Sequence, residues 1–264
     1  RAFARAAWGC RLVSLSLTLF LVSMLLILGL WFQAAFSEPS YGFILAAGVL
    51  GAANWLLAAV GVGLCLSGPP SPGHWGYGVA AAAAAAVHLV LLLVLVGQGK
   101  EYSAGAVVDP QGAGAKWGLV PTRMDAVTFY LTFLLYRDEE LVPKARMNLS
   151  IVVGIAELVR TMLILLLLSC LARAAGDEDL SQECTRAAGV ATFGPGVLAV
   201  LMLLFMVGMV ETNAATGNLG KVLFATIQMG IYAILCGTMF PGWMAARAVT
   251  DACDQPFQSQ IPKL

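Results

Sequence analysis

The sequence predicts an all-α integral membrane protein built as a bundle of transmembrane helices. Hydrophobic residues make up 59% of the chain and charged residues 11%, whereas soluble domains contain about 45–50% and about 25% of these classes. The hydrophobic residues also collect into runs of about 20, the length that a helix needs to cross a hydrocarbon core roughly 30 Å thick. These runs do not alternate, and lipid offers no partner for an open sheet edge, so we expect helices rather than strands.

Six apolar runs are long enough to cross a bilayer. We expect these spans near residues 12–34, 42–66, 76–97, 148–171, 190–210 and 222–243. Most connections between them are short, as in the Pro/Gly-rich turn at 67–76. We therefore predict a single membrane-embedded helical domain over 1–264, with one extramembrane segment at about 98–147.

The segment 124–136, "MDAVTFYLTFLLY", is the candidate for a seventh span. Thirteen helical residues rise only about 20 Å, which is too short to cross the hydrocarbon core. Charged residues also bracket it closely, with Arg123 and Asp125 at one end and "RDEE" at 137–140 at the other. We interpret it as a short interfacial or re-entrant helix, and a tilted seventh span is the alternative.

Small residues indicate two spans that could approach each other closely. Lipid gives apolar helices no hydrophobic reason to associate, so small side chains that let two backbones come together become important. The second run carries Ala47 and Gly51 four residues apart, and the third opens with seven alanines, Ala80 to Ala86. We therefore expect the second and third spans to form a close hairpin across the Pro/Gly turn.

The charge distribution leaves the orientation open. The six-span topology places seven Lys and Arg residues on each side, so the positive-inside rule decides nothing. Three basic residues before the first span slightly favour a cytoplasmic or matrix-like N-terminal side: Arg1, Arg5 and Arg11. The opening "RAFARAAWGCR" has the Arg- and Ala-rich, acid-free composition of an organelle transit region. That interpretation favours an organelle inner membrane; a basic flank that anchors the helix to lipid headgroups is the alternative.

The fourth run carries two opposite charges inside "GIAELVRTMLIL", 154–165. Glu157 and Arg160 are three residues apart, so they lie on one helix face. Either charge alone costs at least about 2.5–3.5 kcal/mol at a helix centre on insertion scales. We therefore expect this face to point away from lipid. The other intramembrane polar candidates are Asn54, His88 and Gln228.

Two roles fit the charged pair. Glu157 could be a proton or ion site with Arg160 as its counter-ion, because ionisable residues inside spans often mark ion pathways. Alternatively, the pair is structural and fixes its helix to a partner such as Gln228 or Asn54, or to another subunit.

Metal and cofactor sites are not predicted. The six cysteines occur singly without a CxxC motif, and His74 is the only histidine besides His88, so a multi-residue ligand set is not expected. Cys184 and Cys253 fall on the same predicted side of the membrane, and the sequence leaves a disulfide between them open. The net charge of zero gives no reason to expect nucleic-acid binding.

The leading functional hypothesis is a non-catalytic, multi-pass membrane subunit of a larger complex, whose partners are lipids and other membrane protein subunits. No P-loop, GxSxG, HExxH or GxGxxG motif is present, so no catalytic residues are predicted. Whether the chain is an enzyme stays open, with a non-catalytic role favoured.

Two other functions are retained. The alternative is a small secondary transporter or channel that uses Glu157 within the bundle, with the 98–147 segment as a gate. The third is a lipid-modifying enzyme at the membrane interface, which would depend on His88 and Glu211.

Overall fold

The computed structural model describes residues 2–36, 41–97, 144–211 and 218–258, and these residues form six helices with no strand among them. The helices are α1 (Ala2–Phe36), α2 (Tyr41–Leu66), α3 (His74–Gly97), α5 (Lys144–Ala174), α6 (Glu178–Glu211) and α7 (Asn218–Gln258). The all-helical class is confirmed for this part of the chain. The predicted short helix at 124–136 and most of the predicted extramembrane segment lie outside the described residues; residues 144–147 already belong to α5.

Three of the helices contain a described stretch that is long and apolar enough to cross a membrane. These stretches are Ala2–Ser23, His74–Leu91 and Ile155–Ala174, and α2 contains a shorter apolar stretch, Ala53–Leu66. Length and composition thus support a membrane-associated helical protein.

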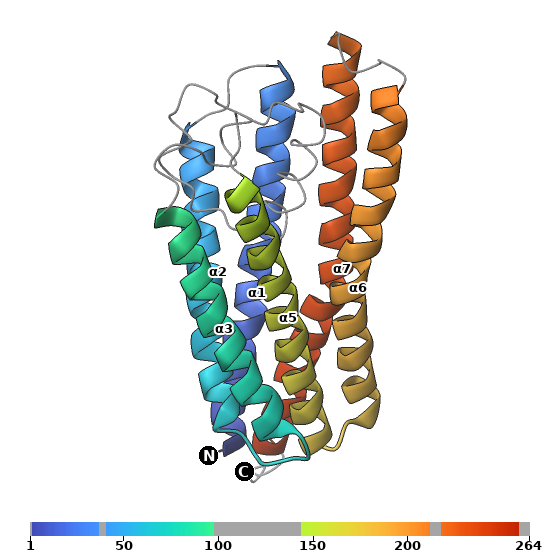
Figure 1. Ribbon diagram of the computed structural model, residues 1–264. Coiled ribbons are helices and arrows are strands. Elements are labelled where there is room, and N and C mark those ends of the chain that lie inside the picture. The colour runs from blue at the N-terminus through green and yellow to red at the C-terminus, as the bar shows by residue number, and fades with distance from the viewer. Residues whose placement is uncertain (1, 37–40, 98–143, 212–217, 259–264) are drawn as a thin grey trace.

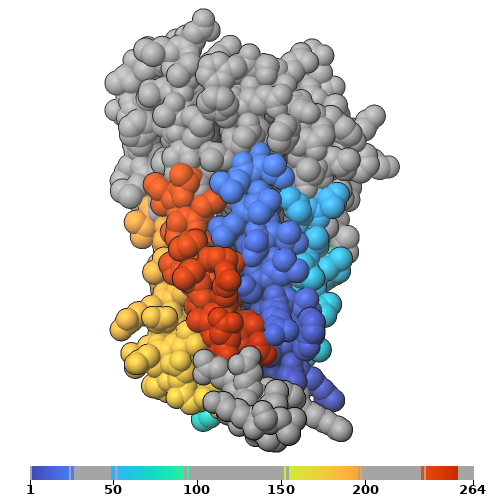
Figure 2. Space-filling view, turned by 180° about the vertical axis from the view of Figure 1, so that it is seen from behind, coloured from blue at the N-terminus to red at the C-terminus, as the bar shows by residue number. Residues whose placement is uncertain are grey.

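The helices lie side by side and alternate in direction (Figure 1). Each helix contacts the next along the chain, and α7 packs against α1, so the six form a closed ring. Figure 2 shows α7 and α1 adjacent, with α6 and α2 on either side. The ends of the first and last helices meet in an ion pair, in which Arg11 Nη2 lies 2.6 Å from Asp254 Oδ2. Inside the ring, α5 also contacts α7 and α2.

Two facing glycines bring α1 close to α2, and α2 and α3 also contact each other across the Pro/Gly turn. The side chains of Ala47 and Gly51 lie outside the described part of α2. A Cβ added at Gly9 would lie 2.7 Å from the Gly61 carbonyl oxygen, and one at Gly61 would lie 2.9 Å from the Gly9 carbonyl oxygen. The contact between α2 and α3 is less extensive. The alanines at the start of α3 cover every face of the helix, so Ala81 and Ala85 are buried, whereas Ala82 and Ala86 are exposed.

Two tight turns close the end of the bundle that carries both chain ends. Gly73 and Gly176 adopt left-handed φ angles of 81° and 87°, which glycine tolerates without strain. After Gly176, the Asp177 carboxylate accepts a hydrogen bond from the Leu180 amide and so caps the start of α6. This turn places Ser169 of α5 against Ser181 of α6, where their hydroxyl oxygens are 2.8 Å apart.

Candidate functional site

Glu157 and Arg160 are both buried inside the bundle. Their exposed fractions are 4% and 3%, and Arg160 Nη2 donates a hydrogen bond of 2.8 Å to Glu157 Oε1. The i,i+3 spacing on α5 brings the two side chains to the same face. Glu157 therefore has an opposite charge beside it on its own helix.

His88 of α3 is the second neighbour of Glu157. Its Nδ1 atom lies 3.1 Å from Glu157 Oε2, and the residue is 2% exposed. One carboxylate oxygen thus faces a guanidinium and the other an imidazole. Imidazole is the side chain whose ordinary pKa lies nearest to neutral pH, so Glu157 has an acid–base group beside it.

A small cavity adjoins the charged pair on the side of α1, α2 and α7. Its volume is about 20 Å³, enough for about one water molecule. Its polar lining consists of Ser16, Asn54, Glu157, Arg160 and Thr161. Apolar side chains complete the wall, including Leu17, Phe20, Ile164, Leu165 and Met239.

The hydroxyl groups at the cavity are already committed as donors. The Ser16 hydroxyl donates to Asn54 Oδ1 and joins α1 to α2. The Thr161 hydroxyl donates to the Glu157 carbonyl oxygen at 3.0 Å. Asn54 still carries two N–H donors on Nδ2, so the α1–α2 wall offers donors to the cavity.

Arg160 has more donors than partners. Its Nε and Nη1 atoms are buried, and neither has a hydrogen-bond partner within the described part of the chain. A guanidinium has five N–H groups and stays protonated, and an unsatisfied buried donor costs about 1–3 kcal/mol or more when it is charged. This site therefore has unused capacity to bind an acceptor.

The cluster lies far from both ends of the bundle. Glu157 follows Lys144 by 13 residues, a rise of about 20 Å along α5, and Ala174 is roughly 26 Å further on. His88 lies 14 residues after His74, about 21 Å along α3. Charges at this depth interact more strongly than in water, because the surrounding dielectric is low.

The structure brings together four of the five predicted polar residues. Glu157, Arg160 and His88 are in contact, and Asn54 lines the same cavity. Gln228 lies in α7, but its side chain is outside the described part, as is that of Glu211, the last residue of α6. Sequence reasoning missed Ser16 and Thr161, and no signal marks them, since hydroxyl residues are common in membrane helices and usually bond to their own backbone.

Three of the cysteines, Cys10, Cys65 and Cys253, lie close together as a separate feature near one end of the bundle. All six are free thiols, including Cys184 and Cys253. Cys10 Sγ lies 3.9 Å from Cys65 Sγ, and the Cys253 thiol is within hydrogen-bonding reach of Cys10. Within residues 2–36, 41–97, 144–211 and 218–258, no group of three His, Cys, Asp or Glu side chains is arranged to hold a metal ion.

The fold and the cluster define a class: an all-helical, membrane-associated protein with an ionisable group at the middle of its bundle. Comparisons with protein-family models, curated proteins and solved structures found no match to this chain.

Proposed function

We propose that the chain is a six-span membrane protein and works as a small secondary transporter, with Glu157 as the residue that binds and releases a proton. The six described helices alternate in direction, and each contains one of the six apolar runs. Large apolar side chains point outward along the bundle, among them Leu15, Leu25, Leu56, Val60, Val90 and Ile155. This inside-out distribution is expected where lipid is the solvent.

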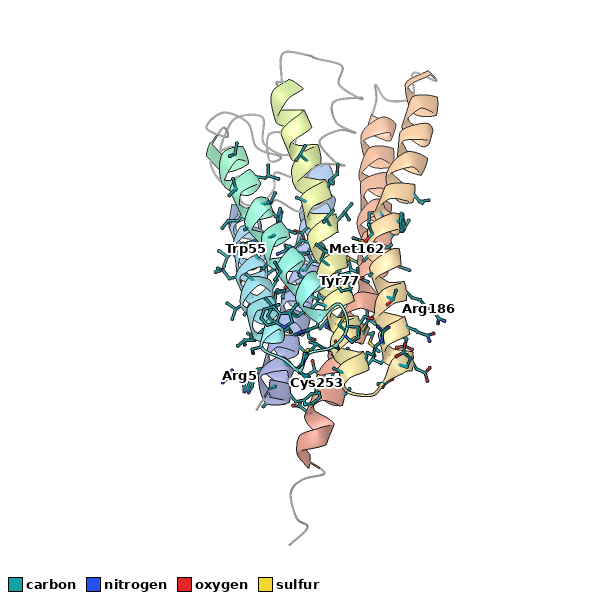
Figure 3. The ribbon with its side chains drawn as sticks, turned by 60° about the horizontal axis from the view of Figure 1, so that its bottom comes forward. Arg5, Trp55, Tyr77, Met162, Arg186 and Cys253 are labelled. Carbon is teal, nitrogen blue, oxygen red and sulfur yellow. The ribbon has the colours of Figure 1, made fainter. Side chains whose placement is uncertain are left out.

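Charged side chains collect where such a protein would meet water. Arg5 on α1 and Arg186 on α6 point away from the bundle at the end that carries the two tight turns (Figure 3). Arg173 and Glu178 form an exposed ion pair there, with a nitrogen–oxygen distance of 3.2 Å. The organelle inner membrane and the gating role of residues 98–147 stay predictions.

The observation that carries the transport proposal is the shared carboxylate of Glu157. A purely structural ion pair needs one partner, whereas Glu157 has a guanidinium on one oxygen and a titratable imidazole on the other, beside a cavity. Arg160 favours the ionised carboxylate by its charge. His88 can accept the proton that Glu157 releases, or return it, because the two groups are 3.1 Å apart.

Access to the cavity would come from movement of the α1–α2 pair against α5. The cavity lies between these elements, and the contact between α2 and α5 is sparse, whereas α1 and α2 hold each other closely. Moving the pair as one body would open the cavity without breaking the Ser16–Asn54 hydrogen bond.

The test is proton flux into liposomes that contain the purified protein and a pH-sensitive dye. We expect Glu157→Gln to abolish flux, because the amide cannot carry the proton. Glu183→Gln is the matched control, since Glu183 is exposed near the start of α6, and its flux should equal that of the wild type. The double variant Glu157→Gln/Arg160→Gln removes both charges and keeps the test valid if the single variant folds poorly. Undiminished flux in either Glu157 variant would refute the mechanism.

A complex subunit is the second candidate, and the outer face of α3 favours it. This face is exposed and built from small or short side chains: Val79, Ala82, Ala83, Ala86 and Val90. Small residues let a neighbouring membrane helix approach closely. The lipid-modifying enzyme gains no comparable support, because His88 is buried beside Glu157 instead of lying at a bundle end.

Native-gel migration after mild detergent extraction separates the two candidates. A band well above the monomer that contains other polypeptides supports the subunit function. A monomer or homo-oligomer that moves protons in liposomes supports the transporter.

A further inference from the structure

We propose that the cavity beside Arg160 binds a small monovalent inorganic anion of halide size, and that this anion crosses together with one proton. The inference rests on the proposed function, because it takes Glu157 and His88 as the proton carriers. It adds the substrate class and the coupling.

Arg160 supplies the anion site. The residue is 3% exposed and lines the cavity, and its Nε and Nη1 donors have no hydrogen-bond partner in the described part of the chain. A permanently charged donor in this position needs an acceptor, and charge-assisted hydrogen bonds to an anion are the strongest kind available. The positive charge also disfavours a cation in the same space.

The opposite wall adds further donors. Asn54 uses Oδ1 to accept the Ser16 hydroxyl, which leaves its Nδ2–H groups for a bound species. The carboxylate of Glu157 is occupied by Arg160 and His88. The Arg160 and Asn54 side chains therefore line one cavity from two helices, and Glu157, which also lines it, is held by Arg160 and His88.

The size of the cavity restricts the ligand. About 20 Å³ holds one species of about the size of a water molecule. A halide such as chloride matches this space, whereas sulfate, phosphate and organic carboxylates are larger.

Charge balance couples the anion to a proton. While Glu157 is ionised, it neutralises Arg160, and a bound anion would leave an uncompensated negative charge in a low-dielectric interior. A proton from solution that binds to the Glu157 carboxylate or the His88 imidazole restores neutrality, with no bond to the anion and no redox step. His88 on α3 and Arg160 on α5 are ionisable groups that face Glu157, and none of the described cavity-lining residues of α1, α2 and α7 is ionisable.

The experiment uses the full chain in liposomes, with an imposed pH gradient and either chloride or gluconate as the main anion. We expect proton uptake in chloride and little in gluconate, with about one chloride entering per proton. The uptake should be insensitive to a potassium–valinomycin voltage, since the paired movement carries no net charge.

Separate variants test the proton site at Glu157 and the anion site at Arg160. Glu157→Gln should keep chloride movement but lose proton uptake, and the remaining flux should respond to voltage. Arg160→Lys keeps the charge but loses the planar donor set, so its apparent chloride affinity should fall about tenfold or more. Arg186→Lys, an exposed substitution of the same kind, should leave the affinity unchanged.

The outcomes distinguish the two proposals. Glu157-dependent proton uptake that is equal in chloride and gluconate overturns the anion inference and leaves the proposed function standing. Absence of Glu157-dependent proton uptake in both anions overturns the proposed function and the coupling with it. Thermal unfolding in detergent gives a readout independent of transport: chloride should stabilise the wild type relative to gluconate, more at about pH 5.5 than at about pH 7.5, and an absent shift overturns the site.

Discussion

Arg160 and Glu157 show how two side chains of opposite charge can be buried together inside a helical bundle. Each offsets the other's desolvation, and His88 adds a third polar group on the far carboxylate oxygen. Breaking a buried pair by removing one partner costs about 3–5 kcal/mol, whereas replacing both partners is often close to neutral. Removing one of the two charges should therefore destabilise the bundle more than replacing both.

We predict that Arg160→Met lowers the free energy of unfolding by about 3–5 kcal/mol. The double variant Arg160→Met/Glu157→Gln should recover most of that loss, because no unpaired charge is left buried. Thermal unfolding in detergent measures both. A double variant that is as unstable as the single one would show that the pair does not act as a unit.

The Cys184 thiol should respond to alkaline pH. Burial, together with the nearby charges of Glu183 and Asp177, raises its pKa from 9.0 to about 12. The folded state thus favours the neutral thiol, and this stabilisation is complete below pH 9.0 and is lost as pH rises toward about 12.

We expect Cys184 in the folded protein to react slowly with a maleimide at about pH 8, because the thiolate is the reactive form. The rate should rise as pH approaches 12, and mass spectrometry of the peptide that contains Cys184 follows it. The unfolded chain is the reference, and equal rates in the two states at about pH 8 would contradict the prediction.

Among the elements, the α1–α2 pair depends on two glycines that face each other. Gly9 and Gly61 meet backbone atoms, so neither position can accept a side chain without separating the helices. Gly63 is on the same helix as Gly61, but nothing lies within 4 Å of an added Cβ there. The pair of positions provides a matched comparison.

Gly61→Ala should destabilise the bundle by about 1–3 kcal/mol, the usual cost of overpacking. Gly63→Ala should be neutral or slightly stabilising, because alanine favours helix over glycine by about 1 kcal/mol. Unfolding curves of the two variants under identical conditions test the difference. Equal effects would mean that the close approach does not hold α1 against α2.

The existence of each described helix was predictable, and so were the bounds of α2 and α3, but the bounds of the longer helices were not. Helix α6 begins 12 residues before the expected span at 190, and α7 continues 15 residues past 243. Hydropathy identifies only the apolar part of a helix, which lipid would surround, and not its polar extensions. The extension of α7 packs as a helix because Ala246, Val249 and Cys253 face inward while Arg247 and Asp251 face outward, a polar–apolar pattern that a span-length window averages away.

The candidate site was predictable only in its local part. The spacing of Glu157 and Arg160 requires that they meet on one face, and the cost of burying charge required shelter. The choice of His88 as the next partner depends on α3 packing against α5, which neither helix's own pattern specifies. The Ser16–Asn54 contact likewise depends on the approach of α1 to α2, for which we made no prediction from the sequence.

At the scale of the whole molecule, the described helices form a ring in which α5 makes the main contacts across the interior. Both the first and the last helix reach the same end of the bundle (Figure 1). The proposed six-span arrangement places the residues near those ends on one side of the membrane.

Cysteine substitutions at Arg5 and Arg186 should therefore react with a membrane-impermeant maleimide from the same side. A cysteine at Gly97, at the other end of α3, should react from the opposite side. Five of the six native cysteines are buried, which keeps background labelling low. Labelling of all three positions from one side would exclude the six-span arrangement.

The contact between Arg11 and Asp254 makes the first and last helices neighbours, so the bundle has no seam that depends on where the polypeptide happens to start. A circularly permuted chain, opened between α3 and α5 and joined by a short linker between α7 and α1, would present the same six surfaces to one another. We therefore expect the permuted chain to fold into the same bundle, because the helix contacts do not depend on the order of the helices in the sequence.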